Sequence, residues 1–159
     1  MRIIKTLAIL LVISACGGGG GSNAPDISDD PDLGNSSDES CSAYSSNIGN
    51  GSTFNCSIVH DNIDRQFFVY IGSGYDSNSP VLFVLHGYTS RGLWIMNYSG
   101  FQSIADDNGF IVVYPQGTLL PATGQTHWNV GGWTTSSSTD DVGFIAVSYT
   151  HLRAHETDS

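Results

Sequence analysis

The chain has 159 residues and carries 15 acidic against 5 basic side chains, for a net charge of −10. This length suits one domain. An acidic chain without a basic patch cannot neutralise phosphates, so the composition argues against nucleic acid as a partner.

The amino terminus predicts export. Basic residues in Met1–Lys5 precede an apolar run at 6–13 that is too short to span a bilayer as a helix. Ile13-Ser14-Ala15-Cys16 follows and resembles a bacterial lipobox. The resemblance implies a lipoprotein signal peptide at 1–16, with a lipid on Cys16 as the membrane anchor. We therefore expect an exported protein, at the bacterial cell surface, in the periplasm or outside the cell. An ordinary secretory signal that contains a cysteine is the alternative.

Residues 17–40 are rich in glycine, serine and acidic side chains, which predicts a disordered linker. Export would place Cys41 and Cys56 in an oxidising compartment, where a disulfide between them is the favoured interpretation. Two free thiols are the alternative. No second Cys/His pair lies nearby, so we expect no metal site, and no cofactor is implied.

Two short β-prone runs, 57–60 and 65–71, flank the turn signal Asp61-Asn62 and predict a hairpin. Two continuous apolar runs follow at 81–85 and 110–114. Such runs are typical of strands buried on both faces, as in a parallel sheet.

Between these two apolar runs, the sequence predicts one helix. Ser99-x-x-Gln102 fits a capping box, Ile104 and Ala105 fall on one helical face behind it, and Gly109 is a natural stop. Strand, helix and strand in this order predict a βαβ unit with a right-handed crossover.

Residues 115–140 form a long segment without periodicity that carries His127, Trp128 and Trp133. Loops of this length are usually functional or disordered, and aromatic side chains beside a sheet edge are typical of a pocket wall. Tryptophans that simply pack the loop down are the alternative. Asp140-Asp141 predicts a helix start, since acids favour the positive end of the helix dipole. A catalytic carboxylate or a metal ligand is the sharper hypothesis for this pair.

Five motifs in order are specific in combination. They are Val84-Leu-His-Gly-Tyr-Thr-Ser90, Met96-Asn-Tyr-Ser-Gly100 with Ile104-Ala-Asp106, Gly109-Phe-Ile-Val-Val-Tyr-Pro-Gln-Gly117, Trp128-Asn129 and Asp140-Asp-Val-Gly-Phe144. Over residues 65–146 the chain resembles the polyhydroxybutyrate depolymerase/feruloyl esterase family of α/β-hydrolases. The resemblance implies an α/β fold class, with an N-terminal β-hairpin, the start of a parallel sheet and a crossover helix. It also implies a secreted serine esterase that cleaves feruloyl or acetyl esters of polysaccharide, or a polyhydroxyalkanoate-type polyester.

The resemblance also implies roles for single residues. In α/β-hydrolases the loop after the strand that ends at His86-Gly87 supplies a backbone N–H to the oxyanion hole, so the implied donor is Tyr88 or Thr89. His86, His127 and Trp128 are expected to line the substrate pocket. His86 is not expected to be the general base, because the triad histidine comes last in the chain of this fold.

The chain contains no Gly-x-Ser-x-Gly nucleophile motif; Gly87 to Gly92 has one residue too many before Ser90. We therefore assign no catalytic residue here and expect the triad Ser, Asp and His beyond Ala146. Residues 147–159 resemble a translated sequencing adaptor, so a non-native tail is expected after an esterase domain part at 41–146. His151 and His155 have the spacing of helical metal ligands but lie in this tail. The fragment alone is expected to be inactive.

A different class of function also fits the sequence. A non-catalytic surface lipoprotein could bind glycan through the tryptophan-bearing loop, Pro115 to Asp140. This hypothesis requires no nucleophile.

Overall fold

The structure is a computed structural model that describes residues 40–157. The predicted signal peptide at 1–16, its Cys16 and the linker up to residue 39 lie outside the described residues. Within residues 40–157, no helix is both long enough and apolar enough to cross a membrane.

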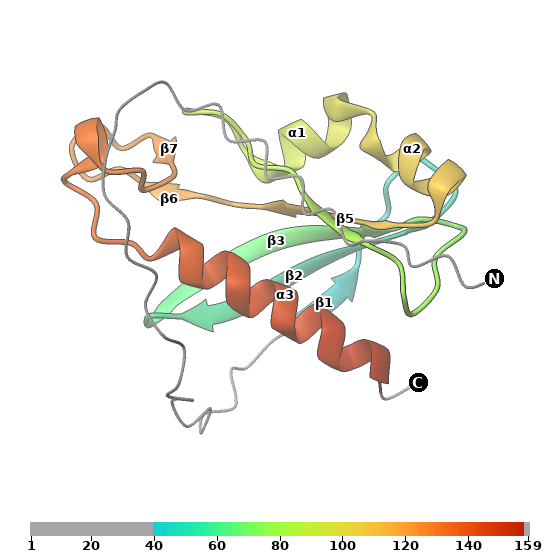
Figure 1. Cartoon of the computed structure of the whole chain (residues 1–159). Coiled ribbons are helices and arrows are strands. Elements are labelled where there is room, and N and C mark those ends of the chain that lie inside the picture. Colours follow the sequence, from blue (N-terminus) through green and yellow to red (C-terminus); the bar gives the residue numbers. More distant parts are fainter. Residues whose placement is uncertain (1–39, 158–159) are drawn as a thin grey trace, which may run out of the picture.

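One sheet of five strands organises the molecule (Figure 1). Its strand order is β1-β2-β3-β5-β4. The strands are β1 Ser40–Ala43, β2 Ser52–His60, β3 Ile63–Ile71, β4 Val81–Phe83 and β5 Ile111–Pro115. A small separate hairpin pairs β6 Thr118–Leu119 with β7 Thr126–His127. The helices are α1 Gly92–Ser99, α2 Phe101–Asn108 and α3 Asp141–Thr157, with a 3-10 turn η1 at Gly132–Thr134.

The fold class expected from the sequence is wrong. The described chain is mostly a mixed β-sheet, in which β1–β2, β2–β3 and β3–β5 are antiparallel and only β4–β5 is parallel. With its three short helices it is not clearly the start of an α/β-hydrolase. The apolar run 110–114 misled the prediction because β5 is buried at all five positions, although its partner β3 runs antiparallel to it. Burial on both faces makes a run continuously apolar, whatever the direction of its neighbours.

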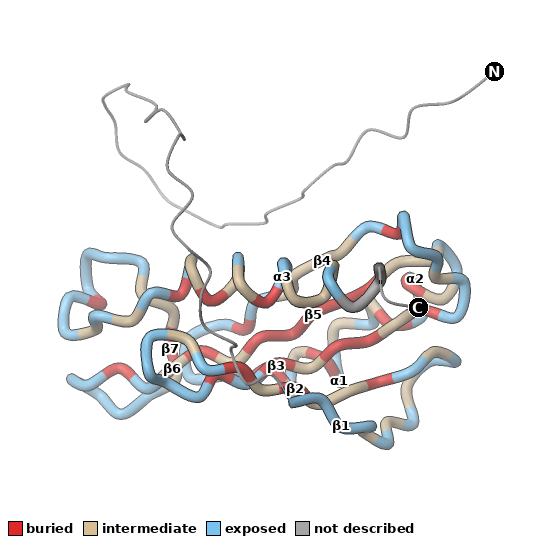
Figure 2. The backbone as a smooth tube through the Cα atoms, turned by 90° about the horizontal axis from the view of Figure 1, so that it is seen from below, coloured by how far each residue is buried: buried red, intermediate tan, exposed pale blue. Residues whose placement is uncertain are grey.

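Helices cover both faces of the sheet, and this explains the burial of β5 (Figures 1 and 2). Successive side chains of a strand point to opposite faces. Ile111 and Val113 accordingly join a core cluster with Phe144 of α3, while Val112 and Tyr114 join a second cluster with residues of α1 and α2.

Local signals placed the turn and one helix end, but not the helix start. Asp61 and Asn62 both adopt left-handed backbone conformations, with φ of 51° and 59°, as a tight hairpin turn requires. Gly109 ends α2 with φ 64°, and its N–H donates to the carbonyl of Ala105. The predicted capping box is absent, because Ser99 is the last residue of α1 and Gly100 precedes α2 without any side-chain cap.

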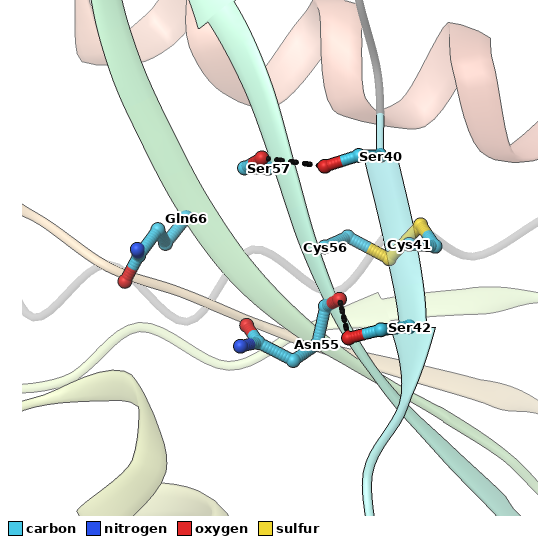
Figure 3. A pocket seen from close by; sticks show the side chains of 7 residues that line it. All are labelled: Ser40, Cys41, Ser42, Asn55, Cys56, Ser57 and Gln66. Carbon is cyan, nitrogen blue, oxygen red and sulfur yellow. Dashed lines mark hydrogen bonds between the residues drawn. A yellow bond between two sulfur atoms is a disulfide. The ribbon is translucent and has the colours of Figure 1, made fainter.

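A disulfide joins Cys41 of β1 to Cys56 of β2, which are directly opposite in the strand register. Figure 3 shows it in the wall of a polar surface cavity of about 170 Å³, beside the hydrogen-bonded hydroxyls of Ser40 and Ser57. The bond attaches the short edge strand to the core, since Cys56 is buried.

Helix α3 includes most of the segment that resembles a sequencing adaptor. Val147 and Leu152 pack partly buried against the core cluster that contains Phe144. Ser148 is fully buried and donates its hydroxyl to the carbonyl of Phe144. Arg153 donates to the carbonyl of Ser79. The origin of this segment stays a prediction.

Candidate functional site

The loop between β4 and α1 contains His86 and the two implied oxyanion donors, and contacts of His86 fix the start of this loop. His86 is buried, and its Nε2 accepts a hydrogen bond from the backbone N–H of Gly117 at 3.0 Å. Its Nδ1 lies 2.8 Å from the carbonyl oxygen of Gly87. Because Nε2 accepts, Nδ1 carries the proton and the ring is neutral. Burial lowers the pKa of His86 below its ordinary 6.5, in agreement with this arrangement.

Trp128 also contacts the loop between β4 and α1. Its indole N–H donates to the carbonyl oxygen of His86 at 2.8 Å, and the two rings lie 5.0 Å apart. Trp128 also packs against the core cluster around Phe144. The structure therefore brings His86 and Trp128 together, in contacts that position the loop.

His127, the third residue expected in the pocket, is buried in β7. Its Nδ1 donates to the carbonyl oxygen of Thr118 at 3.0 Å, so its Nε2 is an acceptor. That Nε2 has no hydrogen-bond partner within residues 40–157. None of the three residues lines the cavity beside the disulfide.

The two implied oxyanion donors differ in availability. The N–H of Thr89 donates to the carbonyl of Thr126 at 2.9 Å, so this group is already engaged. No acceptor for the N–H of Tyr88 occurs in the part of the chain that the structure describes. A side chain at Gly87 would meet nothing within 4 Å, so the backbone before Tyr88 is open to close approach. The geometry thus favours Tyr88 over Thr89 as a donor.

Thr89, in the same loop, has a strained backbone conformation. Its φ of 68° lies in the left-handed region, which a β-branched residue adopts only at a cost. Such outliers cost about 1–3 kcal/mol and cluster at functional sites. The hydrogen bond from Thr89 to Thr126, and the one from the Thr126 hydroxyl to the carbonyl of Ser90, hold the loop in place. The outlier therefore marks this loop as a candidate functional segment.

Sequence reasoning missed a buried ion pair beside the loop. Arg65 of β3 lies 2.6 Å from Asp141 of α3, and both side chains are almost completely buried. Asp141 also accepts the backbone N–H of Asn129, directly after Trp128, at 2.6 Å. The guanidinium lies 4.0 Å from the centre of the Phe144 ring. The available signal was the scarcity of basic residues, since Arg65 and Arg91 are the two that occur between positions 17 and 146.

Asp140, the neighbour of that buried acid, caps α3 as the sequence predicted. Its Oδ1 accepts the N–H of Gly143 at 2.9 Å, and this bond, with help from His60, holds the pKa of Asp140 below 3.8. His60, Asp61 and Asp140 bring ligand atoms within 4.8 Å of one another, a grouping able to hold a metal ion. The positive end of the helix dipole disfavours a cation there, and we assign no metal.

Comparison with known proteins gives one informative relationship. The chain is 35% identical over 68 residues to the bifunctional acetylxylan esterase/xylanase XynS20E of Neocallimastix patriciarum. The match covers 43% of this chain and 10% of that protein, so the chain spans about a tenth of the relative's length. No protein-family model matches the chain. The relationship supports a carbohydrate-esterase-like hydrolase at a coarse level and gives no support to the polyester-cleaving part of the resemblance.

Proposed function

We propose that the protein is a serine-type carboxylic ester hydrolase that removes acyl groups, such as acetyl, from polysaccharide. The similarity to the acetylxylan esterase/xylanase is the observation that carries the proposal. The N–H of Tyr88, which has no acceptor among residues 40–157, lies beside the open backbone of Gly87 and adds geometric support.

In the proposed reaction a serine hydroxyl attacks the ester carbonyl and gives a tetrahedral intermediate with a negatively charged oxygen. The N–H of Tyr88 donates to that oxygen. The base takes the proton of the serine and passes it to the sugar oxygen, which leaves as a hydroxyl as the C–O bond breaks. Water then hydrolyses the acyl-enzyme to the carboxylic acid and the free serine. These 159 residues contain no Gly-x-Ser-x-Gly motif, so we place the serine, acid and base in sequence that follows Ala146 in the complete gene.

The proposal also includes export and a lipid anchor on Cys16, with the substrate met outside the cytoplasm.

The esterase proposal is tested with the protein expressed from the complete gene. We expect release of acetate from acetylated xylan and hydrolysis of p-nitrophenyl acetate. If the purified, folded protein hydrolyses neither ester, the proposal is wrong.

A pair of variants in this full-length protein tests the role of Tyr88. Tyr88→Pro removes the N–H, and we expect kcat for p-nitrophenyl acetate to fall by about 10²–10³-fold. Tyr88→Ala also lacks the phenol ring but keeps the backbone N–H, so its loss of kcat should be far smaller. Equal losses in the two variants would show that the backbone donor is not the reason for the effect.

A further inference from the structure

Two exposed aromatic side chains form a pair beside the candidate oxyanion loop. Tyr88 of that loop is 44% exposed and Trp133 of η1 is 61% exposed. Their ring centres lie 4.9 Å apart and the ring planes are 81° from parallel, so they meet edge to face. We call this pair the aromatic platform. The other tryptophan of the same segment, Trp128, has the opposite role, because its N–H and ring are engaged inside the protein.

Polar contacts hold the ring of Tyr88 and the turn that carries Trp133 in place. The hydroxyl of Tyr88 donates to Oγ1 of Thr123 at 2.9 Å. The turn that carries Trp133 is fixed by the next residue, Thr134, which is fully buried. Its Oγ1 contacts the carbonyl of Gly131 at 2.9 Å and the N–H of Val130 at 3.1 Å. An exposed aromatic ring that is already ordered loses little entropy on binding.

The segment that carries Trp133 is open and uncharged. A side chain at Gly131 or Gly132, directly before Trp133, would meet nothing within 4 Å, and the same holds for Gly87. Residues 117–139 contain no Asp, Glu, Lys or Arg, although the whole chain has a net charge of −10. This surface therefore favours a neutral ligand, and the open backbone at these glycines leaves room for it to approach the rings.

Sugar rings match these properties. One face of a pyranose presents C–H groups that pack on the electron-rich face of an aromatic ring, while the hydroxyls at its rim need hydrogen-bonding partners. The platform supplies the rings, and the same segment is rich in threonine and serine. A charged polymer would find no opposite charge here.

We propose that Tyr88 and Trp133 bind the chain of a neutral polysaccharide, and that this contact places an acyl group on the chain near the N–H of Tyr88. The second half of this inference rests on the proposed esterase function. The first half, glycan binding, does not require it.

The binding test uses the 159-residue chain and soluble xylan in affinity gel electrophoresis. We expect xylan to retard the wild-type chain, and Trp133→Ala and Tyr88→Ala to weaken the apparent affinity by roughly tenfold or more, since each removes a large contact surface. Trp94→Ala is the matched control, because Trp94 is 52% exposed on α1 but lies outside the platform. It should bind like the wild type.

Several results would overturn the inference. They are an unretarded wild-type chain, a Trp133→Ala variant that binds xylan normally, and equal losses in the Trp94→Ala variant. Stronger Trp133-dependent binding to polyhydroxybutyrate granules, or Trp133-dependent self-association in size-exclusion chromatography, would assign the surface to another occupant. If Trp133→Ala does not fold, Trp133→Phe replaces it. In the wild type, xylan should also protect tryptophan fluorescence from a neutral quencher, and the Phe variant should lose that protection.

The two proposals fail in different ways. Trp133-dependent xylan binding without ester hydrolysis by the full-length protein would reject the esterase and keep the platform. Hydrolysis of p-nitrophenyl acetate and acetylated xylan that is unaffected by Trp133→Ala would reject the platform and keep the esterase. If both hold, Trp133→Ala should raise KM for acetylated xylan and leave KM for p-nitrophenyl acetate nearly unchanged.

Discussion

Nη2 of Arg65 lies 2.6 Å from Oδ1 of Asp141, and this buried ion pair ties β3 to the first turn of α3. Because Asp141 also accepts the N–H of Asn129, the same carboxylate fixes the segment that carries Trp128. Trp128 in turn donates to His86. The conformation of the candidate loop therefore depends on this charge pair, which acts on the loop through the segment that carries Trp128.

We predict that Asp141→Asn lowers the free energy of unfolding by about 3–5 kcal/mol, because it leaves the guanidinium of Arg65 buried without a counter-charge. Urea unfolding followed by circular dichroism measures the change. Asp64→Asn, at an exposed position of β3, removes the same charge and should change stability by no more than about 0.5 kcal/mol. A loss at position 141 no larger than at 64 would contradict the structural role of the pair.

The contacts of Asp106 predict that the folded protein loses stability in acid. Its carboxylate accepts N–H groups from Asn50 and Ser73 and the hydroxyl of Tyr70. Burial raises the pKa of Asp106, but these hydrogen bonds outweigh burial and lower it below 3.8. A carboxyl group with a lowered pKa contributes stability above its unfolded value, and this is lost as pH falls through the folded pKa.

Urea unfolding across the acid range tests this for the wild type and Asp106→Asn. The variant should be less stable near neutral pH, and its free energy of unfolding should fall less on acidification, so the two curves converge. Asp107→Asn, at the exposed next position, is the charge control. Parallel curves for wild type and Asp106→Asn would contradict the prediction.

Removal of the disulfide should destabilise the chain by about 3 kcal/mol, the value expected when a cross-link closes a loop of this size. Cys41 and Cys56 are 15 positions apart. The comparison is between the oxidised wild type and a Cys41→Ser, Cys56→Ser double variant, with the reduced wild type as the control. The reduced wild type should match the double variant. Equal stability of all three proteins would show that β1 adds nothing to the core.

Thr89→Gly should raise the free energy of unfolding by about 1 kcal/mol. Glycine relieves the left-handed strain at φ 68°, worth about 1–3 kcal/mol, but costs about 0.5–1 kcal/mol in chain entropy. Thr135→Gly, at an exposed position with an ordinary φ of −61°, has the entropic cost without the relief and should be destabilising. If Thr89→Gly is less stable than the wild type, the conformation of Thr89 is not strained in solution.

Much of the local structure could be predicted from the residues. The turn at Asp61-Asn62 and the end of α2 at Gly109 depend on backbone conformations that few residue types adopt, and such preferences act within a few positions of the chain. The apolar run at β5 was recognisable because burial leaves a direct mark on composition. The run at 81–85 was expected to be buried on both faces as well, but β4 lies at the edge of the sheet and is only half-buried. The start of α2 was not, because Gly100 replaces a side-chain cap.

The candidate site shows the limit of this reasoning. His86, Trp128 and His127 could be singled out as residues, but their contacts could not be foreseen. Only the fold shows that Trp128 faces inward while Trp133 is exposed, since both lie in one segment without periodicity.

The sequence by itself determined roughly where β2, β3, β4 and β5 lie, the turn at Asp61-Asn62 and the end of α2. These depend on short-range backbone preference and on the spacing of apolar residues. The tertiary structure alone decided that β5 lies between β3 and β4 and that Arg65 meets Asp141. It also decided that, within residues 40–157, the N–H of Thr89 has an acceptor while that of Tyr88 has none. Each of these outcomes joins residues far apart in the chain. Strand periodicity carries no information on the identity or direction of a neighbour, so only the packing of the whole sheet can decide them.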